Sequence, residues 1–332
     1  MTPTHPRPSS CGLLLVLLSS PALAVEPPEH AETRELMVVV AAAAELVAER
    51  GAEPACAEFR QAGSRWLDGD LYVFVLDGEG NALCHPAQPS LEGRSLRELR
   101  DPKGKPIVAS FLRELAESED AWVHYQWPRP GSQVFTWKST YVRRATAADG
   151  TSLVVGAGAY ELPMERLFVV EQVDDAVELI ERDGEAAFPV LRDPATGFVF
   201  KTAYVFVLDA GGVLLVNNAF PENEGRDLTE LQDIDGRFFV REMLRVPVGS
   251  AAWIDYKWPR PGDTRPSEKL SYVRAIDWNG TELVVGAGVY FDPEPAVRDL
   301  GPASDAPVVE PDEQPPGSRH RTPRVIGRTQ SP

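Results

Sequence analysis

The sequence predicts an α+β protein made of two similar domains in tandem, each an antiparallel sheet of about five strands with an N-terminal helix packed on one face. Two observations carry this prediction. The chain repeats itself, because LYVFVLDGEGNALCHP at 71–86 returns as AYVFVLDAGGVLLVNN at 203–218. Each copy also opens with a helical pattern of apolar residues and continues with short runs rich in β-branched and aromatic residues.

The duplication extends through several further blocks in the same order. WVHYQWPRPG returns as WIDYKWPRPG, and LVVGAGAY returns as LVVGAGVY. The spacing between matched residues falls from 132 at Tyr72 and Tyr204 to 130 at Tyr160 and Tyr290. This drift indicates two single-residue deletions, a change that loops tolerate. A period of this length exceeds that of solenoid repeats and lies in the size range of one compact domain.

Within one copy the elements follow a regular order. Apolar residues with helical spacing cover 169–180 in the second copy, and 35–50 in the first copy is rich in Ala and Val. Strands at 72–76 and 81–84, joined by an Asp-Gly turn, predict a hairpin. A helix near 108–116 follows. Three more strands contain WVHYQW, WKSTYVRR and SLVVGAGAY, and a Pro-Arg-Pro-Gly turn joins the first two.

The two ends of the chain differ in character from the repeats. Residues 1–24 carry a short apolar run and an Ala-Leu-Ala sequence, which is typical of a secretory signal cleaved near Ala24. We therefore expect a periplasmic or secreted protein. The repeats predict domains at 33–162 and 163–292. The Pro-rich segment 293–332 has few large apolar residues to offset its ordering entropy, so we expect it to be disordered.

Composition narrows the functional classes. The net charge of −17 argues against nucleic acid as a partner. No serine nucleophile motif, zinc-protease motif or phosphate-binding loop occurs, so we expect neither an enzyme nor a cofactor or metal site. Cys56 and Cys84 both lie in the first copy, and Val216 replaces Cys84 in the second. They predict either a disulfide in an oxidising compartment or two small buried residues.

The repeated blocks carry a resemblance. YVFVLD followed by HP, then EGR, WPRPG, YVR and VVGAGAY, resemble Cache domains, in particular the single-Cache, type 2 branch. These are extracytoplasmic sensing modules of bacterial chemoreceptors and histidine kinases. The resemblance implies a PAS-like sheet in each copy and a pocket for a small organic ligand, often a short carboxylate such as acetate, propionate, pyruvate or lactate.

The same resemblance implies a sensor or binding subunit that acts with a membrane receptor or histidine kinase. A second hypothesis belongs to another class. In it the chain is a ligand-free interaction module that docks such a receptor or kinase through its acidic surface, and the repeated aromatic residues are core.

A carboxylate bound in an apolar cavity needs a fixed cation, because an unpaired buried charge is costly. Lys138 and Lys269 are matched between the copies and lie in strand-like runs just before Tyr141 and Tyr272. We predict that these four residues bind the ligand. The alternative for each lysine is an exposed strand position next to an acidic residue.

Aromatic pairs provide the predicted wall of the pocket. Tyr125 and Trp127 are two residues apart and therefore share one face of a strand, as do Tyr256 and Trp258. An aromatic wall with a phenolic donor suits a small polar ligand. The same spacing is equally consistent with core packing.

One candidate position differs between the copies. His85 in the first copy corresponds to Asn217 in the second. Both side chains donate and accept hydrogen bonds, but only histidine titrates near neutral pH. If this position lines a pocket, the two copies differ in their ligand or only one binds. The alternative is a residue that caps a turn.

Overall fold

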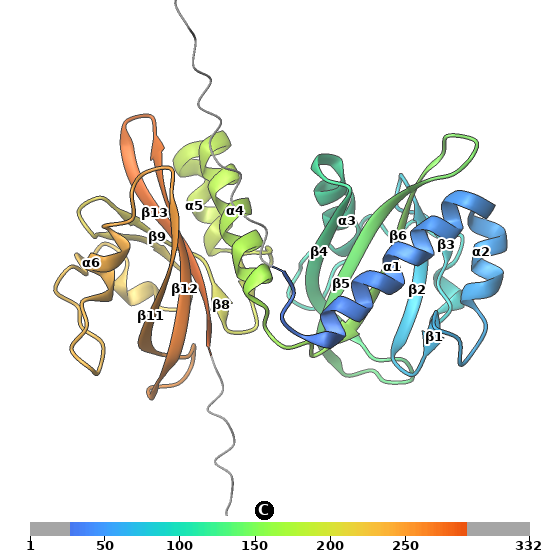
Figure 1. The fold of residues 1–332 in the computed structure, drawn as a ribbon, viewed down its shortest axis with the longest axis horizontal. Helices are drawn as coiled ribbons and strands as arrows, with labels where there is room; N and C mark the ends of the chain where they lie inside the picture. The colour runs from blue at the N-terminus through green and yellow to red at the C-terminus, as the bar shows by residue number, and fades with distance from the viewer. Residues whose placement is uncertain (1–26, 291–332) are drawn as a thin grey trace, which may run out of the picture. The chain divides into compact units, whose positions relative to one another are not determined.

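The computed structural model describes residues 27–290, and each copy folds around its own antiparallel sheet (Figure 1). The α+β fold class predicted from the sequence is confirmed. The predicted signal segment 1–24 and the predicted tail 293–332 lie outside the described residues. The predicted boundary at 162/163 falls in the segment between the last strand of the first copy and the first helix of the second.

The first copy places its helices before and between its strands. Its strand order is β1-β2-β6-β5-β4, and β3 pairs with β2. The elements are α1 (Ala31–Arg50), α2 (Ala52–Phe59), β1 (Leu67–Asp68), β2 (Leu71–Asp77), β3 (Ala82–Cys84), the 3-10 turn η1 (Pro89–Leu91), α3 (Ile107–Glu117), β4 (Asp120–Pro128), β5 (Phe135–Thr146) and β6 (Ser152–Tyr160).

The second copy repeats this order with a shorter helix before its last three strands. Its sheet has the order β10-β9-β13-β12-β11, and β7 pairs with β8 beside it. The elements are α4 (Arg166–Asp183), η2 (Gly184–Ala186), α5 (Ala187–Arg192), β7 (Val199–Phe200), β8 (Ala203–Tyr204), β9 (Phe206–Asp209), β10 (Leu214–Asn217), η3 (Pro221–Asn223), α6 (Phe239–Met243), β11 (Ala251–Pro259), β12 (Pro266–Trp278) and β13 (Thr281–Tyr290).

The register of the first sheet decides which side chains share a face. Tyr125 on β4 lies opposite Lys138 on β5, and Lys138 lies opposite Tyr160 on β6. Directly opposed residues of an antiparallel pair point to the same face. Trp122 lies opposite Tyr141, an odd number of residues from the first pair, so these two side chains point to the other face.

Each face of the first sheet has its own apolar core. On one face α1 packs with residues such as Val40 against Val75, and on the other α3 packs with Phe111 against Phe74. The sequence predicted a helix on one face only, whereas Figure 1 shows α1 and α3 on opposite faces. The sequence did not predict that α3 covers the second face of the sheet. The segment before α3 is irregular, so no periodic pattern indicates the face on which the helix packs.

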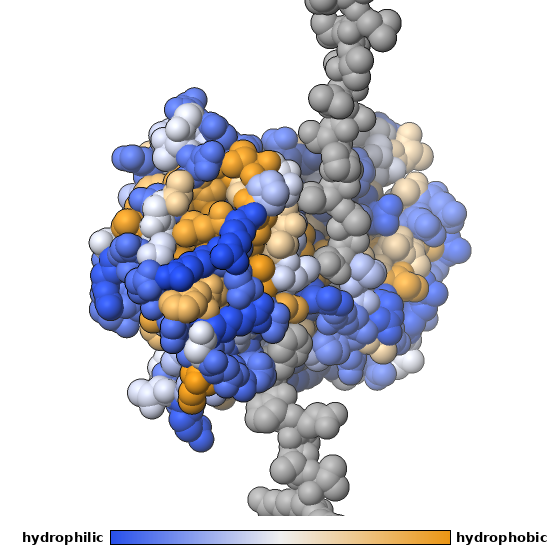
Figure 2. All heavy atoms as spheres, turned by 60° about the vertical axis from the view of Figure 1, so that its left-hand side comes forward, coloured by the Kyte–Doolittle hydropathy of each residue, from blue (hydrophilic) through white to orange (hydrophobic). Residues whose placement is uncertain are grey.

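The surface is predominantly polar. Figure 2 shows mainly hydrophilic side chains on the visible face, with apolar areas between them. The negative net charge of the chain agrees with such a surface. Within residues 27–290, no helix is both long enough and apolar enough to cross a membrane.

Candidate functional site

The buried amine of Lys138 is the most unusual feature of the first copy. Its side chain comes from β5 and is fully buried, and Nζ has no hydrogen-bond partner among the described residues. Nζ lies 3.8 Å from the ring centre of Tyr72 and 4.9 Å from that of Tyr160. Burial lowers the pKa of Lys138 well below its ordinary value, although Asp70 acts in the opposite direction. The aromatic rings therefore enclose an amine that no acceptor satisfies.

A glycine on the neighbouring strand makes room for this amine. A Cβ atom at Gly158 would lie 2.4 Å from Cε of Lys138 and 2.4 Å from Oγ1 of Thr140. Real Cβ atoms do not approach other atoms so closely, so the lysine can lie across β6 only because this position has no side chain.

A small cavity opens between the sheet and α3, next to the lysine. It offers about 30 Å³ to the centres of water-sized molecules, more than a single water requires. A ligand of a few heavy atoms is therefore the largest that fits without side-chain movement. The lining is aromatic and aliphatic and consists of Tyr72, Phe74, Leu76, His85, Leu91, Leu96, Leu99, Ile107, Val108, Phe111, Tyr125 and Trp127.

Lys138 is not part of this lining and lies beside Tyr72 at its edge. Two polar side chains belong to the lining and have defined partners. The hydroxyl of Tyr125 shares a hydrogen bond of 2.8 Å with Oγ1 of Thr140. Nδ1 of His85 accepts a hydrogen bond of 3.1 Å from the backbone N–H of Gln88.

The charge state of His85 follows from its surroundings. Burial lowers its pKa to about 4, and the charge of Lys138 acts in the same direction. The ring is therefore neutral near pH 7. Since Nδ1 accepts the Gln88 bond, the proton lies on Nε2, which is left as a donor.

In the second copy the corresponding lysine has a partner. Nζ of Lys269 donates a 2.8 Å hydrogen bond to the hydroxyl of Tyr204. That hydroxyl lies 3.3 Å from the hydroxyl of Tyr290, which donates to the backbone carbonyl of Pro259 at 2.8 Å. Burial lowers the pKa of Lys269 to about 7. The second copy thus satisfies its buried amine with its own side chains.

Two additional phenylalanines fill the corresponding space in the second copy. The ring of Phe239 stacks on Tyr256 with centres 4.2 Å apart, and it also contacts Trp258. Phe220 packs against Tyr204 and Trp258 with ring centres 5.8 Å and 5.9 Å away. By the alignment of the repeats, these residues correspond to Ile107 and Gln88, which leave the space open in the first copy.

The position that differs between the copies caps a turn in both. Oδ1 of Asn217 accepts backbone hydrogen bonds from Ala219 and Phe220 at 3.1 Å and 3.0 Å. His85 makes the equivalent contact through Nδ1 and in addition lines the cavity. His85 therefore both caps a turn and lines the cavity, the two roles that the sequence left open.

Two of the predicted site residues lie on the face of the sheet opposite the lysines. Tyr141 packs on Trp122, and Tyr272 packs on Trp253, each with ring centres 5.1 Å apart. Each tyrosine is three residues from its lysine, and an odd step along a strand points to the opposite face. The structure brings Tyr125, Trp127 and His85 to the cavity of the first copy, with Lys138 beside them.

The sequence reasoning missed several aromatic residues that shape the two sites. Tyr72 covers the amine in the first copy, and Phe220 and Phe239 fill the space in the second. The signal was present in the alignment of the repeats, because Gln88 opposite Phe220 is a change in volume within a matched block. It was not used.

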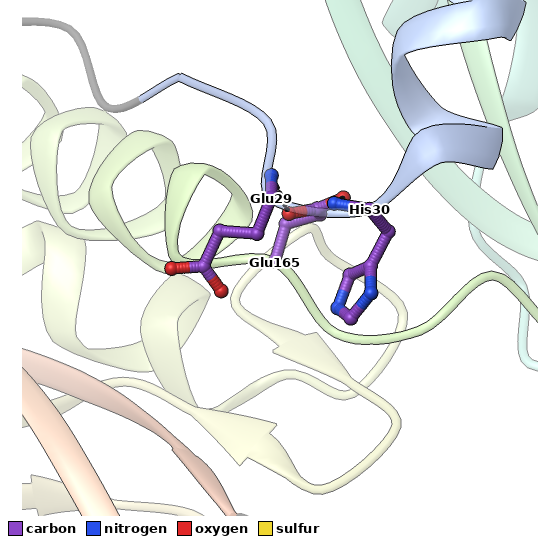
Figure 3. Close-up of side chains that lie close together, drawn as sticks. All are labelled: Glu29, His30 and Glu165. Carbon is purple, nitrogen blue, oxygen red and sulfur yellow. Dashed lines mark hydrogen bonds between the residues drawn. The ribbon is translucent and has the colours of Figure 1, made fainter.

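A group of possible metal ligands lies elsewhere, at Glu29, His30 and Glu165. The Glu165 carboxylate accepts hydrogen bonds from the backbone N–H groups of Glu29 and His30, at 2.7 Å and 3.1 Å (Figure 3). The Glu29 carboxylate also forms an ion pair with Arg166. These contacts tie the segment before α1 to the residue before α4 and account for the cluster without a metal ion.

The repeat structure and the fold agree with a known family. The family described as Cache domain (dCache_2) matches residues 61–166 and again residues 185–295, together more than half of the chain. The chain belongs to the Cache domain family, and the two matches fit two tandem copies, as predicted.

Two relatives are sensory proteins. Methyl-accepting chemotaxis protein McpP of Pseudomonas putida is 32% identical over 90 residues, which are 27% of this chain and 16% of that protein. Sensor histidine kinase MctS of Rhizobium johnstonii is 32% identical over 93 residues, 28% of this chain and 20% of that protein. The chain thus spans no more than a fifth of the length of either relative.

Among solved structures, one similar chain is a Cache chemosensory domain described for its recognition of carboxylic acids. It is 22% identical, covers 40% of this chain and 95% of its own length, and superposes with a TM-score of 0.34. The family model and the two relatives thus show Cache domains related in sequence to segments of a chemotaxis protein and a sensor histidine kinase.

Proposed function

We propose that the first copy binds a short carboxylate in the cavity beside Lys138, and that the chain acts as an exported sensor or binding subunit. The observation that carries this proposal is the buried amine of Lys138, which has no hydrogen-bond partner in the described part of the chain. A carboxylate is the simplest ligand that supplies both the missing acceptor and the missing charge.

The energetics support an anionic ligand. A buried amine without an acceptor pays its full desolvation cost, which is why its pKa falls. A carboxylate beside it favours the ammonium form and adds a charge-assisted hydrogen bond worth about 1.5 to 3 kcal/mol. Binding then takes up a proton, so we expect the affinity to decrease as the pH rises.

The size and lining of the cavity limit the ligand further. The space of about 30 Å³ and its aromatic and aliphatic walls suit an acid with a short apolar chain. Nε2 of His85, a residue of the lining, is left as a donor, and Lys138 lies beside Tyr72 of the same lining. Acetate, propionate, pyruvate and lactate are the acids to test.

The second copy supports the proposal by contrast. Lys269 already donates to Tyr204, and Phe220 and Phe239 occupy the corresponding space. We infer that the second copy binds no ligand of this class. The two lysines therefore form a matched pair in which one is a ligand-binding residue and the other a structural residue.

The family and the relatives support a proposal for the cellular role. Segment 1–24 has the sequence of an export signal, and the two relatives are a chemotaxis receptor and a sensor histidine kinase. We propose a periplasmic or secreted location. We also propose that a membrane receptor or histidine kinase binds the ligand-bound form of the protein. The alternative of a ligand-free interaction module does not account for the amine that has no partner within residues 27–290 and the cavity beside it, which the ligand hypothesis explains.

The test is thermal unfolding and calorimetric titration with the four acids. Propionamide serves as the uncharged control ligand. A ligand at 100 times its dissociation constant stabilises the native state by about 2.7 kcal/mol. We expect a shift with at least one acid, none with propionamide, loss of the shift in Lys138→Met and retention of the shift in Lys269→Met.

The outcomes separate the hypotheses. A shift lost only in Lys269→Met would assign the ligand to the second copy and contradict the proposal. No shift with any acid, while both variants remain folded, would favour the interaction module. An equal shift with propionamide would show that the ligand is recognised by shape and not by charge.

A further inference from the structure

Cys56 and Cys84 meet in the interior of the first copy although they lie far apart in the sequence. Cys56 belongs to α2 and Cys84 ends β3, and these two elements are in contact. Both side chains are buried, with exposed fractions of 3% and 0%, and both thiols are free. Both side chains belong to the same cluster of buried residues, and each thiol shifts the pKa of the other. Two buried thiols that neighbouring elements bring into one cluster are the starting arrangement for a disulfide.

The surroundings favour reaction at one of the two sulfurs. The pKa of Cys56 lies below its ordinary value because the Cys84 thiol hydrogen-bonds to it and the positive charge of Arg60 is near, although burial opposes this. The pKa of Cys84 is raised by the same hydrogen bond and by burial. The thiolate is the nucleophile in disulfide exchange, so Cys56 is the first sulfur to react.

The pair joins two parts of the fold that are already connected by polar contacts. Arg60, just after α2, forms a 2.9 Å ion pair with Glu92. Glu92 in turn accepts a 2.8 Å hydrogen bond from the backbone N–H of His85, which follows Cys84 directly. A covalent bond between the sulfurs therefore reinforces the connection between α2 and the residue that lines the cavity.

The second copy has the polar connection without the thiols. Arg192 pairs with Glu224 at 3.0 Å, and Glu224 accepts the backbone N–H of Asn217 at 2.6 Å. Val216 stands in place of Cys84 and is fully buried. The fold therefore needs neither cysteine, and the thiol pair is an addition specific to the first copy.

We propose that Cys56 and Cys84 are a dithiol site that is oxidised to a disulfide, which locks α2 to β3 next to the cavity. The oxidant is a disulfide compound, such as oxidised glutathione. The Cys56 thiolate attacks one sulfur of the oxidant and releases one thiolate from it. Once Cys56 is part of the mixed disulfide its thiol no longer raises the pKa of Cys84, and the Cys84 proton passes to the thiolate released in the first step. The Cys84 thiolate then attacks the mixed disulfide at the Cys56 sulfur and releases the second thiolate, which takes up a proton from solvent. Two protein thiols are oxidised, and one disulfide is reduced to two thiols.

The experiment is refolding of the protein in a mixture of reduced and oxidised glutathione, followed by alkylation and peptide mapping. We expect one peptide pair joined through Cys56 and Cys84 and a mass loss of two hydrogen atoms. We also expect the reduced protein to melt about 5 to 15 °C lower than the oxidised protein, because the bond closes a loop in the unfolded chain.

The matched control is Cys84→Val, which introduces the residue that the second copy uses. It should fold, show no cross-linked peptide and melt at the same temperature with and without reductant. Full alkylation of both cysteines after refolding in the glutathione mixture would overturn the proposal. So would a stable glutathione adduct on either sulfur, since the pair would then be too poorly aligned to close.

Discussion

The two copies share the arrangement of a buried lysine and tyrosine rings on one face of the sheet, but they differ in whether the lysine has a hydrogen-bond partner. Both carry a buried strand lysine under tyrosine rings, opposite a tyrosine of the neighbouring strand. In the first copy the amine of Lys138 has no acceptor within the described residues and a cavity lies beside it. In the second, Tyr204 satisfies Lys269 and two phenylalanines fill the space.

The comparison shows that two copies of one fold can differ in the partner of a buried lysine and in the packing around it. In the second copy the hydroxyl of Tyr204 accepts a hydrogen bond from Lys269, whereas in the first copy the matched Tyr72 places its ring beside Lys138 and makes no hydrogen bond to the amine. Phe220 and Phe239 in addition pack against the aromatic side chains of the second copy. An unsatisfied amine and an open cavity each cost stability. We infer that the first copy keeps the unsatisfied amine and the open cavity because a bound ligand supplies the acceptor and fills the space.

The largest effect is expected from the filling residue of the second copy. Phe239→Ala removes a ring that stacks on Tyr256 and contacts Trp258. We expect a loss of about 3 to 5 kcal/mol in the free energy of unfolding, measured by urea denaturation, because a buried ring is deleted and a cavity remains. A loss below about 1 kcal/mol would mean that the ring does not fill the core.

Filling the first copy in the same way should abolish binding. The double variant Ile107→Phe with Gln88→Phe gives the first copy the residues of the second. We expect the stabilisation by a short carboxylate, about 2.7 kcal/mol at 100 times the dissociation constant, to disappear in thermal unfolding. The unliganded variant should stay folded, because the second copy folds with the same two rings. Unchanged binding would place the ligand elsewhere.

The partnered lysine should destabilise the protein in a pH-dependent manner. The pKa of Lys269 is about 7 in the folded state and 10.5 ordinarily, so between these values the unfolded chain binds a proton that the folded chain does not. Wild-type stability should therefore rise with pH across this window. We expect Lys269→Met to be more stable by about 2 to 3 kcal/mol at pH 7.

The measurement is urea denaturation of wild type and Lys269→Met at pH 7, 8.5 and 10. The advantage of the variant should shrink toward pH 10. An advantage that stays constant with pH would show that the amine keeps its proton and that burial does not control it.

The smallest effect is expected at the position where histidine replaces asparagine. The pKa of His85 is about 4 in the folded state against 6.5 ordinarily, so the unfolded chain takes up the proton first as the pH falls. Wild-type stability should decrease by about 1 to 2 kcal/mol between pH 6.5 and 4.5 through this residue. His85→Asn, which introduces the residue of the second copy, should lack this contribution in acid denaturation followed by circular dichroism. An identical pH profile for the two proteins would contradict the buried, neutral histidine.

Much of the fold was accessible from the sequence because its signals are local. The duplication, the order of elements and the hairpins follow from blocks such as the Asp-Gly and Pro-Arg-Pro-Gly turns, and β2, β3, α3 and β4 to β6 lie close to the predicted ranges. The predicted site residues divide between the two faces of the sheets. Tyr125, Trp127 and His85 line the cavity, whereas Tyr141 and Tyr272 were misplaced, although strand alternation alone would have excluded them.

The amino-acid sequence alone shows two copies of one Cache domain, a lysine in a strand-like run of each, and a histidine in one copy where the other has an asparagine. Only the tertiary structure decided which lysine has a partner and which copy keeps an open space. A buried amine gains its acceptor from a side chain distant in the sequence, as Lys269 does from the Tyr204 hydroxyl, and the space beside it is filled by rings such as Phe220 from another segment. Their approach depends on how α3, α6 and the loops pack over each sheet.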